Sequence, residues 1–179
     1  MIDKEKNREN FLQLASTIKM DGMAELLQWL DTTDFFTAPA STKYHLSESG
    51  GLCQHSLNVA MCYPYDDKFL PLFHDLGKVG FYKTELRNAK NDRGEWVKVA
   101  YYTCDDETLP LGHEMRTIFL LTRFVKLTEE ETCAIMYHHG GFGNAVKGGD
   151  FAIQNAWKKF QKALELHIAD LKATYIFEK

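Results

Sequence analysis

Two adjacent residues, His74 and Asp75, are the most informative feature of this sequence. They lie inside the apolar stretch Leu-Phe-His-Asp-Leu-Gly-Lys, residues 72–78. An imidazole and a carboxylate are costly to bury without partners, so their position in an apolar segment needs a chemical explanation. Both groups are good ligands for a divalent metal ion. The doublet therefore predicts a metal site.

Further residues of ligand type lie on both sides of the doublet in an ordered series along the chain. They are His55, His113, the pair His138 and His139, and Asp170. Mixed imidazole and carboxylate ligands suit Mn²⁺, Fe²⁺, Co²⁺, Ni²⁺ or Zn²⁺, and match poorly the all-oxygen preference of Ca²⁺ and Mg²⁺. The ligands expected for a first ion are His55, His74, Asp75 and Asp170. His113 and the histidine pair are then available for a second ion, with Asp75 bridging the two. Successive residues of a helix point about 100° apart. Either both histidines of the pair are ligands, or one is a ligand and the other faces elsewhere.

This series resembles the HD-domain metal-dependent phosphohydrolase superfamily. The local sequence motifs are also similar. They are Gly-Gly-Leu-x-x-His-Ser around His55, His-Asp-Leu-Gly-Lys at the doublet, Gly-His at His113 and Ala-Asp at Asp170. It is closest to the HD part of bacterial 3′-to-5′ exoribonucleases and to small HD phosphohydrolases, and covers residues 44–177. The resemblance implies an HD-domain helical bundle. It also implies an enzyme in which a metal-activated water hydrolyses phosphate ester bonds of a nucleotide-type substrate.

Other polar residues are candidates for catalysis and substrate binding beside this series. Lys78 follows Asp75 by three residues, so on a helix it faces the same side. We therefore expect Asp75 and Lys78 to be the catalytic residues. The residues expected to bind substrate are Lys78, Lys83, Arg87, Arg116 and His45. His167 stands one helical turn before Asp170. It is expected to orient Asp170 as an outer partner that does not itself bind the metal.

Composition narrows the class of protein. The chain has 179 residues, 45% hydrophobic content and a net charge of −4, and its mean hydropathy is −0.34. We expect no membrane association, because no stretch approaches the roughly 20 apolar residues of a membrane span. The charged N-terminus does not have the pattern of a secretory signal. The four cysteines lack a Cys-x-x-Cys spacing, so we expect reduced thiols and a cytoplasmic protein.

The elements that must position these residues are mainly helical. Apolar periodicity predicts helices over 4–20, 23–31, 112–126 and 152–177, with further helices carrying His55 and the His-Asp doublet and one running from Thr128 into the histidine pair. Aromatic and β-branched residues on either side of a Gly turn predict a β-hairpin over about 81–105. We expect this hairpin to be a wall or lid near the metal. Residues 140–149 are expected to be a Gly-rich loop.

The whole chain, residues 1–179, is expected to form one HD domain. Helices within 1–43 then pack on an HD core formed by 44–177, and about six or seven helices are expected in all. The apolar stripes of the first two helices are either core or the surface of a homodimer.

Three functions remain open at this point. The first is a phosphohydrolase acting on a small phosphorylated substrate of nucleotide type. The second is a single-strand-specific nuclease that acts, like 3′-to-5′ exonucleases, on a short single-stranded nucleic acid. The third is a non-catalytic, metal-holding ligand sensor or protein-binding module.

Overall fold

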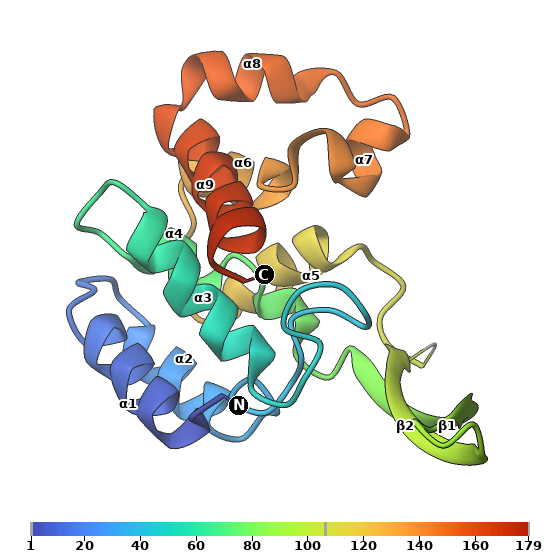
Figure 1. Ribbon diagram of the computed structural model, residues 1–179. Coiled ribbons are helices and arrows are strands. Elements are labelled where there is room, and N and C mark those ends of the chain that lie inside the picture. Colours follow the sequence, from blue (N-terminus) through green and yellow to red (C-terminus); the bar gives the residue numbers. More distant parts are fainter. Residues whose placement is uncertain (1, 106, 179) are drawn as a thin grey trace.

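The computed structural model describes residues 2–105 and 107–178. These residues form nine α-helices and a single two-stranded hairpin, so the expectation of a mainly helical fold with one hairpin is confirmed. The helices gather into one body (Figure 1). The expected number of helices was too low, because the chain divides its last helical region and adds short helices.

The first two helices are α1 (Lys4–Ala15) and α2 (Met23–Leu30). The predicted first helix ended at residue 20, which is wrong, because the hydroxyls of Ser16 and Thr17 bond backbone carbonyls three residues earlier and compete with the helix. The apolar stripes belong to the core: the largest side chains on them, such as Phe11, are fully buried.

The next helices are α3 (Gly51–Cys62) and α4 (Phe69–Phe73), followed by the 3₁₀ helix η1 (Leu76–Lys78). His55 lies on α3, as expected. The prediction that a helix carries the doublet is wrong: α4 ends at Phe73, and His74 and Asp75 form the turn between α4 and η1.

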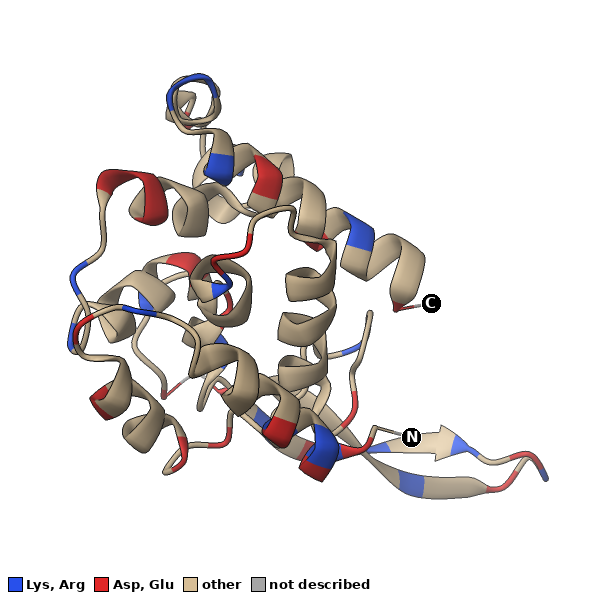
Figure 2. Ribbon diagram, turned by 90° about the vertical axis from the view of Figure 1, so that its left-hand side faces the viewer, with Lys and Arg blue, Asp and Glu red and all other residues tan. Residues whose placement is uncertain are grey.

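The hairpin consists of β1 (Tyr82–Lys90) and β2 (Trp96–Cys104), which are antiparallel with Tyr82 opposite Cys104. Both faces are largely exposed. Figures 1 and 2 show that the hairpin extends away from the helices and carries charges of both signs. The hairpin was expected to be a wall or lid near the metal. The lid part of this expectation is wrong, because the hairpin does not cover the histidine cluster.

Two helices follow the hairpin, α5 (His113–Leu121) and α6 (Glu129–Tyr137). The predicted helix over 112–126 ends early, at Leu121. The predicted start of α6 is confirmed: the Thr128 hydroxyl accepts from the backbone of Glu131, and the Glu131 carboxylate accepts in return. This capping box fixes the direction in which α6 delivers the histidine pair.

The Gly-rich segment after α6 contains the 3₁₀ helix η2 (Gly140–Phe142) and the short helix α7 (Asn144–Lys147). It was expected to be loop. Four-residue helices leave little periodicity to detect in a sequence.

The last helical region is divided into α8 (Ala152–Lys159) and α9 (Gln161–Lys172), and continues into the π-helix η3 (Ala173–Phe177). One helix over 152–177 was expected, which is wrong, because Phe160 adopts an extended conformation. The two pieces bury different surfaces: α8 packs on a small cluster with Tyr137, whereas α9 enters the main core. A straight helix would not reach both.

The main core is one continuous cluster to which helices from both ends of the chain contribute. Within it, α3 packs against α1, α4 and α9, while α6 packs against α5 and α9. This arrangement brings together the parts of α3, α5, α6 and α9 that carry the predicted ligands, and η1 packs against α5. Within the described residues, every helix is too short or too polar to cross a membrane, and all four cysteines are free thiols.

Candidate metal centre

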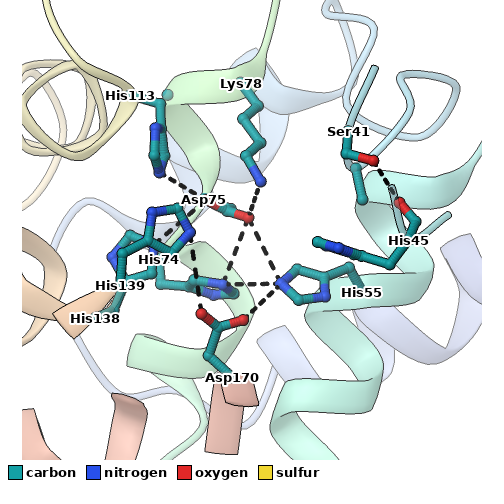
Figure 3. A network of polar contacts seen from close by, with 12 residues as sticks. Ser41, His45, His55, His74, Asp75, Lys78, His113, His138, His139 and Asp170 are labelled. Atoms are coloured by element: carbon teal, nitrogen blue, oxygen red, sulfur yellow. Dashed lines mark hydrogen bonds and ion pairs between the residues drawn. The ribbon is translucent and has the colours of Figure 1, made fainter. Parts of the chain in front are cut away.

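Five segments deliver imidazole and carboxylate side chains to one buried place (Figure 3). The residues that meet there are His55, His74, Asp75, His113, His138, His139 and Asp170. The structure thus brings together all seven residues that the sequence predicts as ligands. They come from α3, the turn after α4, α5, the end of α6 and α9.

Asp75 is at the centre of the group. Its Oδ1 atom lies 3.5 Å from Nε2 of both His113 and His138. Its Oδ2 atom lies 3.6 Å from Nε2 of both His55 and His74. Each carboxylate oxygen therefore faces a different pair of histidines.

These spacings match those of ligands that share an ion. Two ligands about 2.0–2.2 Å from one ion lie about 2.8–3.6 Å apart in octahedral to tetrahedral geometry. The Nε2 atoms of His55 and His74 are 3.3 Å apart, and His55 Nε2 is 3.1 Å from Oδ1 of Asp170. Together with the four distances to Asp75, all these separations fall within that range.

Several atoms of the group also lack other partners. Asp75 Oδ1, His113 Nε2 and His138 Nε2 are buried and have no hydrogen-bond partner among the described residues. A buried polar atom without a partner is costly. The donor set and the unpaired atoms therefore fit a divalent cation. Three groups could hold one: Asp75 with His113, His138 and His139; Asp75 with His55 and His74; and His55 with His45 and Glu178. The first two share Asp75.

Both members of the histidine pair reach the group. His138 caps the C-terminal end of α6, and His139 follows it with helical φ and ψ angles. Their ring centroids are 4.2 Å apart. His139 Nε2 also lies 4.0 Å from Oδ2 of Asp170, so Asp170 faces His55 with one oxygen and His139 with the other.

Backbone carbonyls orient two of the imidazoles. Nδ1 of His74 donates to the carbonyl of Pro71 at 2.9 Å, and Nδ1 of His138 donates to the carbonyl of Ile135 at 2.6 Å. A hydrogen bond that places the proton on Nδ1 leaves the lone pair on Nε2 free for a metal. Both acceptors stand three residues before their histidine, at the ends of α4 and α6.

Two carboxylates that the sequence did not single out orient the remaining histidines. Glu178 accepts from Nδ1 of His55 at 3.0 Å and from the Asn58 amide at 2.8 Å. Glu114 lies 3.4 Å from Nδ1 of His139 and 3.5 Å from Nδ1 of His113. Glu114 follows His113 directly, which was a usable signal, whereas no pattern connects Glu178 with His55.

Burial and neighbouring charges set the protonation states. Burial lowers the pKa of both His74 and His113 to about 3, so these rings are neutral. Burial also acts to lower the pKa of His55, but its hydrogen bonds to Asp170 and Glu178 outweigh burial and raise it to about 10. Acceptors that hold a proton on His55 so firmly also favour a metal cation there.

Lys78 forms a buried ion pair with Asp75. Its Nζ lies 2.7 Å from Asp75 Oδ2. Burial alone would raise the pKa of Asp75, but Lys78 and the imidazoles hold it well below its usual range. The sequence predicted that Asp75 and Lys78 share one face of an α-helix. They lie instead at a 3₁₀ helix, in which residues three apart are aligned, so the predicted contact still forms.

Two glycines permit the close approach of these segments. A Cβ atom on Gly77 would lie 2.1 Å from the His113 carbonyl oxygen and 2.7 Å from the Thr117 backbone nitrogen. Gly140 has φ +55°, and a Cβ atom there would lie 2.5 Å from the His167 ring. Because Gly77 has no side chain, η1 can pack against the start of α5. Because Gly140 has none, the turn that carries the histidine pair can pack against His167.

His45 and His167 lie beside the cluster. His45 Nε2 is 3.8 Å from Oε2 of Glu178, and burial lowers its pKa to about 4. His167 was expected to orient Asp170. Its Nδ1 instead donates to the His138 carbonyl at 2.6 Å, and its ring stacks on Trp157, so it supports the histidine pair.

The structure does not bring three of the expected substrate-binding cations to the cluster. Arg116 donates to the carbonyl of Val79 and covers the ring of Phe81. Lys83 and Arg87 lie on the hairpin, where they line a separate hollow of about 530 Å³. Of the expected cations, Lys78 alone contacts a residue of the cluster.

No family model, no curated protein and no solved structure matches the chain.

Proposed function

We propose that this chain is a divalent-metal-dependent phosphohydrolase that hydrolyses phosphate esters of a nucleotide-type substrate. The observation that carries the proposal is the position of the Asp75 carboxylate. Its two oxygens face two separate pairs of histidine Nε2 atoms. A carboxylate in that position would be able to hold one ion with each oxygen. Paired ions are a common means of in-line displacement at phosphorus.

The residues of the site have distinct tasks in such a reaction. Bound ions lower the pKa of water and offset negative charge on the phosphate oxygens. Asp75 and Asp170 would hold the ions together with the histidines. Although burial opposes it, Asp75 raises the pKa of Lys78 above its usual value, so Lys78 stays charged. It then supports a phosphate oxygen as a cation and does not act as a proton donor.

We propose two ions per chain, from the set Mn²⁺, Fe²⁺, Co²⁺, Ni²⁺ and Zn²⁺, because the donors are imidazoles and carboxylates. The variant His113→Ala removes a ligand from one group only. It is expected to halve the metal content measured by elemental analysis and to abolish hydrolysis while the protein remains folded. One ion per saturated wild-type chain would contradict this.

A single-strand-specific nuclease is the second candidate. It is favoured by the exposed aromatic side chains of Tyr44, Phe142 and Tyr175 beside the cluster, because aromatic platforms bind unstacked bases. The same metals and the same residues would serve this reaction.

One screen tests both candidates. Nucleotides and short single-stranded oligonucleotides are incubated with each metal, and released phosphate and oligonucleotide length are measured. Asp75→Asn should lose both bound metal and hydrolysis, whereas Asp92→Asn, an exposed control on the hairpin, should keep both. A metal-loaded wild-type protein that releases no product from any ester would contradict the enzyme proposal and favour a non-catalytic sensor.

A further inference from the structure

A cavity of about 660 Å³ lies against the histidine cluster. Its lining includes His139 and Asp170, which also belong to the cluster. The other lining residues come from the segment before α3, the η2–α7 region and the end of α9 through η3, which lie around the C-terminal end of the chain (Figure 1). A group bound in this cavity would therefore be continuous with a phosphate held at the cluster.

Three aromatic side chains from these separate segments line the cavity and are exposed. Tyr44 is 75% exposed, Phe142 64% and Tyr175 58%. Single exposed aromatic residues are ordinary on a protein surface, but several gathered on one concavity indicate a binding site. Aromatic faces of this kind pack well against another flat ring.

The charged side chains that line the cavity disfavour binding of a highly charged group there, in addition to the phosphate at the cluster. Lys147 is the only Lys or Arg among the described residues that line it. The carboxylates of Asp170 and Glu178 also line it, and both are already engaged by His55. A chain of further phosphates would meet one lysine and two carboxylates there, so the cavity suits an uncharged planar group.

We infer that this cavity is a nucleobase subsite and that Tyr44, Phe142 and Tyr175 select phosphate esters that carry a base over those that do not. This inference rests on the proposed function, because it places the scissile phosphate at the histidine cluster. The substrate class is then a nucleoside phosphate whose reacting phosphate adjoins the nucleoside, as in a nucleoside monophosphate or at the end of a short strand. Base stacking supplies affinity without selecting strongly among bases.

Equilibrium binding to the metal-loaded protein tests the subsite without requiring turnover. The probes are the non-hydrolysable phosphonate analogues of a nucleoside monophosphate, ribose 5-phosphate and octyl phosphate, measured by calorimetric titration. We expect the nucleotide to bind at least about tenfold more tightly than ribose 5-phosphate. Equal affinities of these two probes would overturn the inference. Octyl phosphate binding as tightly as the nucleotide would assign the cavity to an apolar tail and would also overturn it.

Matched variants locate the effect. Phe142→Ala and Tyr175→Ala should each weaken nucleotide binding by about fivefold to a hundredfold and leave ribose 5-phosphate unaffected. Tyr175→Phe should retain wild-type affinity, as should Phe151→Ala, an exposed phenylalanine outside the cavity. Unchanged nucleotide affinity in both alanine variants would overturn the inference.

The two proposals fail in different ways. If nucleotides bind preferentially but no ester is hydrolysed, the subsite stands and the proposed function is wrong. If the protein hydrolyses octyl phosphate and nucleotides equally well, and Phe142→Ala changes neither rate, the subsite is wrong and the proposed function stands.

Discussion

At the scale of single residues, the site depends on the hydrogen bonds and ion pairs that orient each ring or carboxylate. Asp75 is fixed by Lys78, and His55 by Glu178. Such outer partners fix the tautomer of a ligand and raise its basicity. The cluster is therefore oriented before any ion binds, which reduces the cost of assembling the coordination geometry.

Glu178→Gln tests this arrangement at His55. Glutamine keeps the shape of the side chain but loses the charge that strengthens the hydrogen bond to Nδ1. Metal affinity is expected to fall by about tenfold to a hundredfold, measured by competition with a chelating dye. Glu9→Gln, an exposed control on α1, should leave it unchanged, and equal affinities of the two variants would refute a positioning role for Glu178.

The pKa of His55 predicts the pH dependence of metal binding. In the metal-free protein this pKa is raised to about 10, so His55 carries a proton that an ion on Nε2 must displace. His74 and His113, with pKa values of about 3, are already deprotonated at neutral pH. Affinity at the His55 group should therefore rise about tenfold per pH unit from roughly pH 6 to pH 8. Titration in weak buffer should detect the released proton, and an affinity independent of pH would contradict this assignment.

At the scale of elements, the site is made where segment ends converge. His74 and Asp75 lie in the turn after α4, His113 begins α5, and His138 caps α6. Segment ends leave backbone carbonyls free, and two of these accept from ligand histidines. Close packing of η1 on α5 is what brings His113 to Asp75.

Gly77→Ala tests that packing. The added Cβ would lie 2.1 Å from a backbone oxygen of α5, so η1 and α5 must separate. We expect destabilisation of about 1–3 kcal/mol in urea unfolding, together with loss of the ion bound by His113. Gly141→Ala is the control, because a Cβ there meets nothing within 4 Å. Two ions per chain in Gly77→Ala would show that the contact is dispensable.

At the scale of the whole molecule, the ligands connect distant parts of the chain. His55 lies on α3 and Asp170 on α9, and the remaining ligands come from the segments between them. Metal that binds these positions only when they are assembled stabilises the folded state through mass action. The hairpin lies outside this network, because it projects from the helical body (Figure 1).

Removal of metal should therefore lower thermal stability. At a free metal concentration of about 100 times Kd, each bound ion stabilises the folded state by about 2.7 kcal/mol. For a chain of this size, that corresponds to a Tm shift of roughly 5–10 °C for each ion. Calorimetry with and without a chelator measures it, and Asp75→Asn should show no shift. An unchanged wild-type Tm after verified metal loss would contradict a role of the ions in joining these segments.

The sequence by itself determined the candidate ligands, the predominance of helices, the hairpin and the capping box at Thr128. These features depend on residue type and short-range spacing, which are visible in one dimension. The expected ends of the helices near residues 20 and 126 were wrong, because local hydroxyl bonds and packing decide where a helix stops.

Tertiary structure alone decided how the ligands are grouped and supported. The division of Asp75 between two pairs of histidines depends on the turn after α4 and on the approach permitted by Gly77. Glu178 meets His55 across 123 positions of the chain, and Phe160 breaks the last helical region because its two halves pack on different clusters. Such contacts join residues far apart in sequence, and local periodicity carries no information about them.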